Sequence, residues 1–265
     1  MLRACTATYR VGSKALISNI DLDLQPGKLM AVIGPNGAGK STLLRILSGE
    51  LRSTSGTVEL DGRSISSYRA DELARRRAVV SQATALAFPF TAREVVLLGA
   101  TVPGFVSASE QVEHAAIEAL RTVGLLGLAD RLYPHLSGGE RQRVHIARAL
   151  LQLAFGHCDD AEPSILLLDE PTSSLDLAHQ GVVLAEARRQ ARCGRAVLAV
   201  LHDLNLAAAF ADELVLMSKG RIAAHGTAQE VFRDELLSRS YGCEVRTNAT
   251  PEPGVPFVLP HARRD

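Results

Sequence analysis

A short glycine-rich segment constrains the fold of this 265-residue chain more than any other feature. The sequence GPNGAGKST at positions 34–42 matches the pattern G-x-x-x-x-G-K-[ST] and directly follows the apolar residues 29–33. Glycines allow the backbone to turn tightly, so that its N–H groups point toward phosphate oxygens. Residues 42–47 have helical apolar spacing, and the positive N-terminal end of a helix attracts an anion. A buried strand, a phosphate loop and a helix in this order indicate an α/β fold.

The residue types in this loop predict nucleotide binding. Lys40 is expected to reach the β- and γ-phosphates, and the Ser41 hydroxyl is expected to coordinate Mg²⁺. A plain glycine-rich turn would not require a buried strand before it and a helix after it. The predicted nucleotide-binding residues are Gly34, Pro35, Asn36, Gly37, Ala38, Gly39, Lys40, Ser41 and Thr42.

Two further apolar runs end in side chains that can act on phosphate chemistry. Residues 165–168 precede Asp169 and Glu170, and residues 196–201 precede His202. Ligands of such sheets bind at the carboxyl ends of the strands. Asp169 is expected in the Mg²⁺ shell, Glu170 as the base that orients the attacking water, and His202 facing the γ-phosphate. Alone, a strand ending in two acids more often just meets solvent, and a lone histidine is more often structural.

The sequence LSGGE at positions 136–140 is the most discriminating motif. Ser137 and Glu140 have the spacing of a capping box that opens a helix. That role does not explain Gly138 and Gly139, since a glycine inside a helix costs about 1 kcal/mol. Glycines at a helix start permit close approach of the backbone to an anion.

The periodicity changes along the chain. Residues 1–65 read as β-rich, and residues 83–150 are mostly helical, with Ser107 and Glu110 predicted to cap the helix that contains residues 112–123. Buried strands return after residue 151. We therefore expect one domain over residues 1–245, with a core formed by 1–82 and 151–245 and a helical insertion over about 83–150. Residues 246–265, with several prolines, are expected to be an irregular tail.

Composition excludes several classes of function. The 29 basic and 29 acidic residues give no net charge, aromatic residues are 4%, and tryptophan is absent, which disfavours a general nucleic-acid binder. The four cysteines form no C-x-x-C pair, which disfavours a zinc or redox motif. We expect the polar cluster His157, Cys158, Asp159 and Asp160 to be a solvated loop and not a metal site. No apolar run reaches the roughly 20 residues of a membrane span, so membrane work would require another protein.

Over residues 1–245 the chain resembles the nucleotide-binding subunits of ABC transporters, because the phosphate loop, LSGGE, the strand acids and the histidine occur in that family's order. The resemblance implies an α/β P-loop NTPase core with an antiparallel β subdomain and an inserted helical subdomain. It also implies an active ATP hydrolase with ATP and Mg²⁺ as ligands.

The resemblance adds roles that the residues alone do not establish. It implies that Tyr9 stacks on adenine, that Gln82 contacts Mg²⁺ and senses a membrane partner, and that residues 173–176, ending in Asp176, couple two subunits. It also implies that Ser137, Gly138, Gly139 and Glu140 contact ATP held by a second copy. Simpler alternatives are an edge-strand aromatic for Tyr9, a solvated loop residue for Gln82 and a helix cap for Asp176.

The same resemblance implies partners. It implies a homodimer that associates with two transmembrane permease subunits at the cytoplasmic face of the bacterial inner membrane, served by a periplasmic substrate-binding protein. Separate ATPase and permease chains are typical of importers. A soluble translation factor usually has two cassettes in one chain, a DNA-repair ATPase needs a long coiled-coil insertion, and a guanine-nucleotide switch needs an N-K-x-D signature. An exporter subunit remains an alternative.

Three segments bear on the cargo. Residues 87–96 look like the branch that imports iron siderophores, haem and cobalamin. The sequence LDLAHQ at positions 175–180 and the extended loop over residues 154–164 look like haem importers specifically. We therefore expect haem as cargo, with siderophore or cobalamin as the alternative. Phe88 and Phe90 are expected either in the core or lining a groove for a permease helix.

Overall fold

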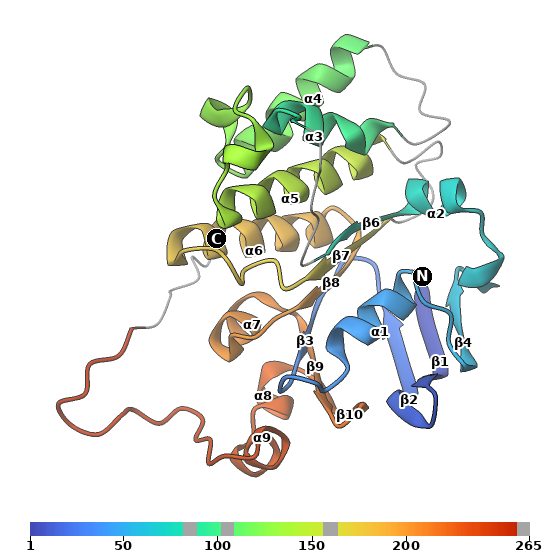
Figure 1. Ribbon diagram of the computed structural model, residues 1–265. Helices are drawn as coiled ribbons and strands as arrows, with labels where there is room; N and C mark the ends of the chain where they lie inside the picture. The colour runs from blue at the N-terminus through green and yellow to red at the C-terminus, as the bar shows by residue number, and fades with distance from the viewer. Residues whose placement is uncertain (82–88, 102–108, 156–163, 259–265) are drawn as a thin grey trace.

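Two β-sheets organise the chain (Figure 1). The computed structural model describes residues 1–81, 89–101, 109–155 and 164–258. Within these residues, one sheet has four antiparallel strands in the order β2-β1-β4-β5. The second sheet has six strands in the order β10-β9-β3-β8-β7-β6.

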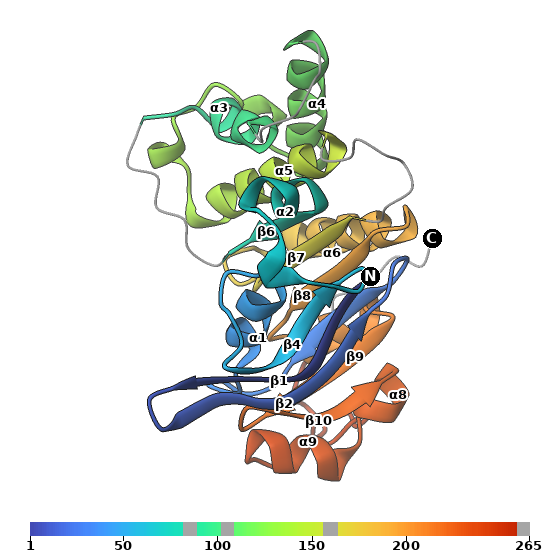
Figure 2. The same cartoon turned by 90° about the vertical axis from the view of Figure 1, so that its right-hand side faces the viewer.

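The antiparallel sheet is built largely from the N-terminal part of the chain. Its strands are β1 (Leu2–Val11), β2 (Lys14–Leu24), β4 (Ser55–Leu60) and β5 (Arg63–Ser64). Along β2 near its end, buried positions alternate with more exposed ones, as expected when one face of a sheet packs on a core. Figure 2 shows the β1-β2 hairpin extending beyond the larger sheet.

The six-stranded sheet positions the chemistry. Its strands are β3 (Leu29–Ile33), β6 (Arg77–Val80), β7 (Ile165–Asp169), β8 (Ala196–Val200), β9 (Glu213–Ser218) and β10 (Arg221–Gly226). All neighbours are parallel except β10, which pairs antiparallel with β9 at the edge. Every residue of β3, β7 and β8 is buried, because both faces of the sheet are covered. The phosphate loop, Glu170 and His202 follow these three strands at the same edge.

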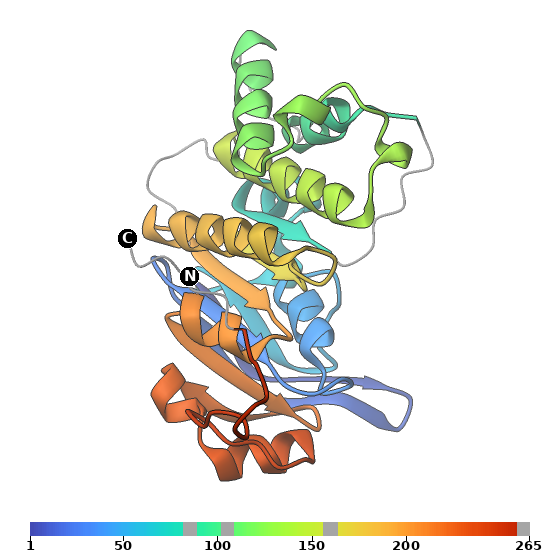
Figure 3. The same cartoon turned by 90° about the vertical axis from the view of Figure 1, so that its left-hand side faces the viewer.

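Each face of this sheet has its own core. On one face, Met30, Val32 and Leu198 pack with α1 (Lys40–Leu47) and the antiparallel sheet. On the other face, apolar side chains from alternate strand positions pack against helices (Figure 3). These helices are α5 (Gly138–Phe155), α6 (Leu177–Arg192), α7 (Leu204–Phe210), α8 (Ala228–Val231) and α9 (Asp234–Tyr241).

A group of helices lies at the end of the molecule opposite α8 and α9 (Figures 1 and 2). It contains α3 (Ala92–Leu97), α4 (Ser109–Thr122) and most of α5, with 3₁₀ turns at Leu98–Ala100, Leu126–Leu128 and Tyr133–His135. Another 3₁₀ turn at Ile65–Ser67 and α2 (Ala70–Arg76) lead into β6. The Gln152 side chain on α5 donates to the carbonyls of Ala74 and Arg77, at 2.7 and 2.9 Å. It thereby ties this group to the six-stranded sheet.

Helix α5 departs from the expected boundaries. It runs without interruption from Gly138 to Phe155, so the predicted limit of the helical insertion at residue 150 falls inside it. The prediction that an extended loop begins at Ala154 is wrong, because residues 154 and 155 still belong to the helix. The other residues of that loop up to 163, including the polar cluster 157–160, lie outside the described residues, as do Ser107 and Phe88. The division of the chain into core, insertion and tail stays a prediction.

The end of the described chain contains no regular element. Gly242 caps the C-terminal end of helix α9 and has the left-handed φ of 73° that favours glycine. Residues 246–258 contain neither helix nor strand and are mostly exposed. Across the part of the chain that the structure describes, we find no helix with the length and apolar character needed to cross a membrane.

Candidate functional site

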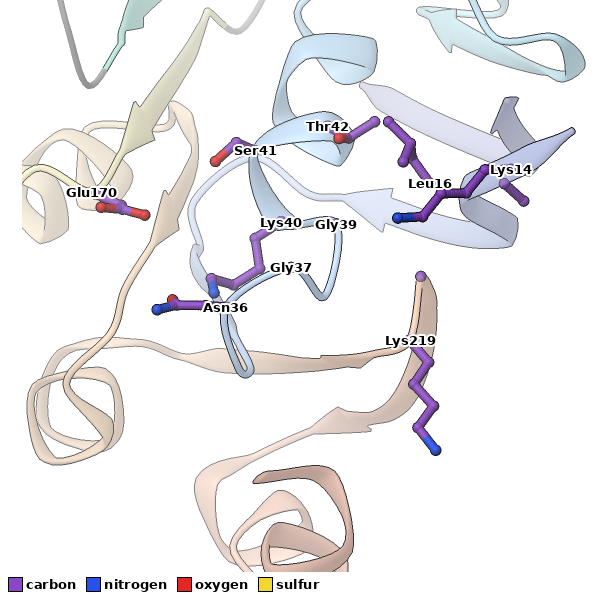
Figure 4. A pocket seen from close by; sticks show the side chains of 12 residues that line it. Lys14, Leu16, Asn36, Gly37, Gly39, Lys40, Ser41, Thr42, Glu170 and Lys219 are labelled. Carbon is purple, nitrogen blue, oxygen red and sulfur yellow. The ribbon is translucent and has the colours of Figure 1, made fainter. Parts of the chain in front are cut away.

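A cavity of about 530 Å³ lies on the phosphate loop (Figure 4). Four parts of the chain form its walls: the phosphate loop with the start of α1, the start of β2, the turn after β9, and Glu170 beyond β7. Its lining residues are Lys14, Ala15, Leu16, Asn36, Gly37, Gly39, Lys40, Ser41, Thr42, Glu170, Lys219 and Gly220.

Two glycines of the loop are required by close packing. Gly34 has a φ of 142°, and a Cβ atom there would lie 2.1 Å from the carbonyl oxygen of Met217. Gly39 has a φ of 99°, and its Cβ would lie 2.7 Å from the Ile17 side chain. Any other residue would push the loop away from β2 and β9. The loop is therefore held tightly on its inner side while its outer side forms the cavity.

Lys40 is held inside the loop. Its ammonium donates to the carbonyls of Gly34, at 2.8 Å, and Pro35, at 3.1 Å, and the residue is only 5% exposed. Burial lowers the pKa of Lys40, against the opposing effect of the Glu170 and Asp169 carboxylates. A desolvated ammonium is stabilised by a nearby anion, so this side chain suits a phosphate group.

Asp169 and Ser41 bring oxygen ligands together at the same place. The Ser41 hydroxyl donates to Asp169 Oδ1 over 3.1 Å, and Asp169 is 6% exposed. Burial raises the pKa of Asp169, partly offset by the Ser41 hydrogen bond. A buried carboxylate beside a hydroxyl fits Mg²⁺, which prefers oxygen ligands and is coordinated by few protein side chains. Gln82, the third predicted ligand, lies outside the described residues.

Glu170 and His202 meet although they are 32 positions apart. His202 Nε2 lies 2.5 Å from Glu170 Oε1, and the glutamate side chain is 12% exposed while the histidine is 42% exposed. Glu170 has a φ of 52°, a left-handed conformation that non-glycine residues adopt at a cost. Its backbone N–H donates to the carbonyl of Val200, which fixes this turn at the end of β7. The strained turn aims the carboxylate into the cavity.

The LSGGE segment forms the predicted capping box at the start of α5. The Glu140 N–H donates to Ser137 Oγ at 3.2 Å, and the Ser137 N–H donates to Glu140 Oε2 at 2.6 Å. These bonds lower the pKa of the Glu140 carboxyl. Ser137 and Gly138 are exposed, and none of the LSGGE residues lines the cavity of this chain.

The loop between β7 and α6 packs against this segment. A Cβ on Gly139 would lie 2.7 Å from the carbonyl oxygen of Ser174, so contact within the chain already explains one of the two glycines. Asp176 caps α6, because its Oδ1 accepts from the backbone N–H of His179 at 2.9 Å. That hydrogen bond is the largest of several effects that lower the pKa of Asp176. The helix cap is thus real, and coupling of two subunits through Asp176 stays a prediction.

Comparison with known proteins identifies this arrangement. The sequence pattern that defines the ABC transporter family matches residues 17–173. The chain belongs to the ABC transporter family. It is 49% identical over 259 residues to the hemin import ATP-binding protein HmuV of Rhodopseudomonas palustris strain BisB18, covering 98% of this chain and 94% of that protein. It is 43% identical over 264 residues to the protein of the same name from Rhizobium meliloti strain 1021, covering 99% of both chains.

Solved ABC structures share the fold. A dimeric ATP-binding cassette in a post-hydrolysis state with bound ADP and Pi superposes with a TM-score of 0.74 at 28% identity, covering 86% of this chain and 99% of that one. The cbiO1 protein of Clostridium perfringens, part of the ABC transporter complex cbiONQ, gives 0.72 at 26% identity, covering 90% and 92%. The predicted α/β fold of an ABC ATPase is confirmed. As a member of this family the chain is an ATPase that couples ATP hydrolysis to transport.

Two other residues singled out in the sequence, Tyr9 and Phe90, do not line the cavity of this ABC ATPase. Tyr9 is half-buried against the core beside the antiparallel sheet. The edge-strand alternative for Tyr9 is wrong, because β1 lies between β2 and β4. Adenine stacking by Tyr9 stays a prediction. Phe90 is half-buried and packs against the core that includes the helical group.

Two walls of the site were not predicted from the sequence: the start of β2, with Lys14 and Leu16, and the turn after β9. Lys219 and Gly220 form the two-residue turn between β9 and β10, with φ values of 49° and 75°. Positive φ at both positions is typical of a type I′ hairpin turn, and Lys-Gly between two strands was a signal for it. Gly220 donates to the Ala38 carbonyl at 3.1 Å, and a Cβ there would lie 2.6 Å from the Leu16 carbonyl oxygen. The turn therefore joins the phosphate loop to β2.

Proposed function

We propose that this chain is the ATPase subunit of a haem importer. The observation that carries the proposal is the similarity, at 43–49% identity over nearly the full length, to proteins named for hemin import. The geometry supports the ATPase half of this proposal, since Lys40, Asp169, Glu170 and His202 lie together at one edge of the sheet. The cargo half rests on the relatives, because an ATPase need not touch what the permease carries.

The phosphate loop binds ATP through its backbone N–H groups and Lys40. The ammonium exchanges the Gly34 and Pro35 carbonyls for the β- and γ-phosphates, which are stronger acceptors because they are charged. Ser41 and Asp169, with Gln82 as a further candidate, hold Mg²⁺. This ion supplies charge neutralisation for phosphoryl transfer.

Glu170 acts on the attacking water. Its carboxylate accepts a hydrogen bond from the water, orients it toward the γ-phosphate and takes its proton. His202 contacts the same carboxylate, fixes its orientation and remains exposed enough to reach the γ-phosphate. Phosphoryl transfer depends mostly on positioning and charge stabilisation, which this pair and Lys40 provide.

A second copy completes the site. Ser137 and Gly138 are exposed at the N-terminal end of α5 but do not line their own chain's cavity. An anion is stabilised at a helix N-terminus, so this end suits the γ-phosphate bound by another copy. The result is a homodimer with two composite sites. It works on two permease subunits, peripherally at the cytoplasmic face of the inner membrane, and is served indirectly by a periplasmic substrate-binding protein.

Growth on haem tests the proposal. Cells that lack this protein should fail to grow with haem as sole iron source yet grow on free iron salts. Wild-type protein should restore growth, whereas Lys40→Ala should not, because it removes the cation from the phosphate loop. Normal growth on haem with lost use of ferric siderophores or cobalamin would transfer the proposal to that cargo. Restoration by Lys40→Ala would contradict the ATPase role.

A further inference from the structure

The two ends of the cavity differ in the chemistry they offer. Glu170 lies at one end, and the start of β2, with Lys14 and Leu16, lies at the other (Figure 4). Lys40 and the phosphate loop lie between these ends. Because the water that Glu170 orients attacks the γ-phosphate, a bound nucleotide must place its γ-phosphate at the Glu170 end. Its α-phosphate and ribose then lie toward Thr42 and the start of β2.

The start of β2 is fixed against the phosphate loop. Gly39 leaves room for Ile17 and for the Leu16 carbonyl, which a Cβ would approach to 2.7 and 2.9 Å. The Ser18 N–H donates to the Gly220 carbonyl at 2.8 Å, and Gly220 in turn donates to the phosphate loop at Ala38. Three segments distant in sequence are thus locked together by backbone contacts. The base of the Lys14 side chain has a defined position relative to the loop.

Of the three lysines that line the described cavity, only Lys14 points toward the phosphate loop without being bonded to it. Lys40 is buried and bonded to loop carbonyls, and the Lys219 side chain points away from the loop in Figure 4. The Lys14 side chain is exposed, and its ammonium points toward the phosphate loop. Among the residues that the structure describes, we find no carboxylate within ion-pair distance of Lys14.

From this placement we propose that Lys14 is a nucleotide-binding residue that contacts the α-phosphate end of the bound nucleotide. The inference rests on the proposed binding of ATP at the phosphate loop. Because the α-phosphate occurs in both ATP and ADP, Lys14 stabilises the two nucleotides equally. It strengthens binding without acting on the hydrolysed bond.

Calorimetric titration of the full chain with ADP and with the non-hydrolysable analogue AMP-PNP tests this. Lys14→Met should weaken both nucleotides by the same factor, about three- to tenfold, as expected for one partly exposed charge-assisted contact. The loss should shrink at high salt, because screening weakens exposed charge pairs. In ATPase assays the KM should rise by that factor while kcat changes little. Lys14→Arg, which keeps the cation, should restore most of the affinity.

Lys219→Met is the matched control, since it removes the same charge from another wall of the same cavity. Because the Lys219 ammonium points away from the loop, this variant should lose less than about twofold in nucleotide affinity. Equal losses of nucleotide affinity in the two methionine variants would overturn the inference. The loss would then reflect the total positive charge near the cavity and not a contact made by Lys14. Unchanged affinity in Lys14→Met, or a loss for AMP-PNP alone, would overturn it as well. If the wild-type chain bound neither nucleotide, the proposed ATPase function would fall with it.

Discussion

The two regions that carry this ATPase's motifs differ in how complete they are within one chain. At the phosphate loop, Lys40 and Asp169 are buried and already have partners, and the walls of the cavity lock together through backbone contacts. At the start of α5, the Ser137–Glu140 capping box satisfies the helix end, but Ser137 and Gly138 stay exposed. The first region is thus assembled from residues of one chain. The second region does not line the cavity of its own chain.

The two adjacent glycines of the LSGGE segment also differ in whether their own chain requires them. Gly139 is needed by its own chain, since Ser174 occupies the space of a side chain. Gly138 has no atom nearer than 3.9 Å to the place of a Cβ, so nothing in its own fold demands glycine there. We propose that Gly138 allows close approach to the ATP held by a second copy.

The largest effect is expected at the phosphate-loop region. Glu170→Gln should lower ATP turnover about 10²- to 10⁴-fold, because glutamine holds the water but cannot accept its proton at neutral pH. Binding of Mg-ATP should persist, and the variant should accumulate as a dimer. Light scattering with Mg-ATP measures this. A strictly monomeric species at high protein concentration would contradict the composite site.

Ser137→Arg tests the other region. The bulky cation should block the approach of a second copy's ATP, so hydrolysis should fall by about 10²-fold, comparable to the loss of an in-trans charge stabiliser. ATP binding to the monomer should equal that of the wild type, because Ser137 does not line the cavity. Titration with AMP-PNP at low protein concentration checks this point. Reduced binding to the monomer would place Ser137 in its own chain's site.

Alanine substitutions at Gly138 and Gly139 should distinguish a glycine needed for stability from one that the fold does not require. Gly139→Ala should destabilise the chain by about 1–3 kcal/mol, since its methyl group would collide with the Ser174 carbonyl. Gly138→Ala should leave the free energy of unfolding unchanged or raise it by up to about 1 kcal/mol, because alanine favours a helix. Urea unfolding of the two variants gives both values. Equal destabilisation would remove the distinction between the two glycines.

The sequence predicted the parts of the site that local patterns determine. The loop that holds Lys40 and the strand that ends at Asp169 each need only a short stretch of residue types, so both could be placed in advance. The capping box at Ser137 is equally local. Helix α2 and strand β6 had no comparable pattern and were not foreseen.

Contacts between distant segments could not be predicted in the same way. Gly220 lies 182 positions from Ala38 of the phosphate loop and farther still from β2, and it contacts both only because β9 pairs with β3. The order of the six strands sets which turns reach the cavity, and no single segment contains that information. Tyr9 shows the reverse case. The family resemblance assigns it adenine stacking, but Tyr9 is not among the residues that line the cavity.

The smallest effect concerns the burial of Asp169, and it measures how far the phosphate-loop region is prepared for a cation. Burial raises the pKa of Asp169 above its ordinary value of 3.8, so the native state keeps this proton to a higher pH than the unfolded chain does. The contribution of Asp169 to the stability of the fold is therefore full below the ordinary pKa and is lost as pH rises through the native pKa.

Asp169→Asn cannot ionise and can still accept a hydrogen bond from Ser41. In the absence of Mg²⁺ and nucleotide, this variant should melt a few degrees higher than the wild type at pH 7, and the difference should shrink as pH falls. Mg-ATP should then stabilise the wild type more than the variant. Thermal unfolding across this pH range, with and without Mg-ATP, measures both effects, and a variant that melts lower at pH 7 would show that Asp169 is stabilised as a carboxylate by its own chain.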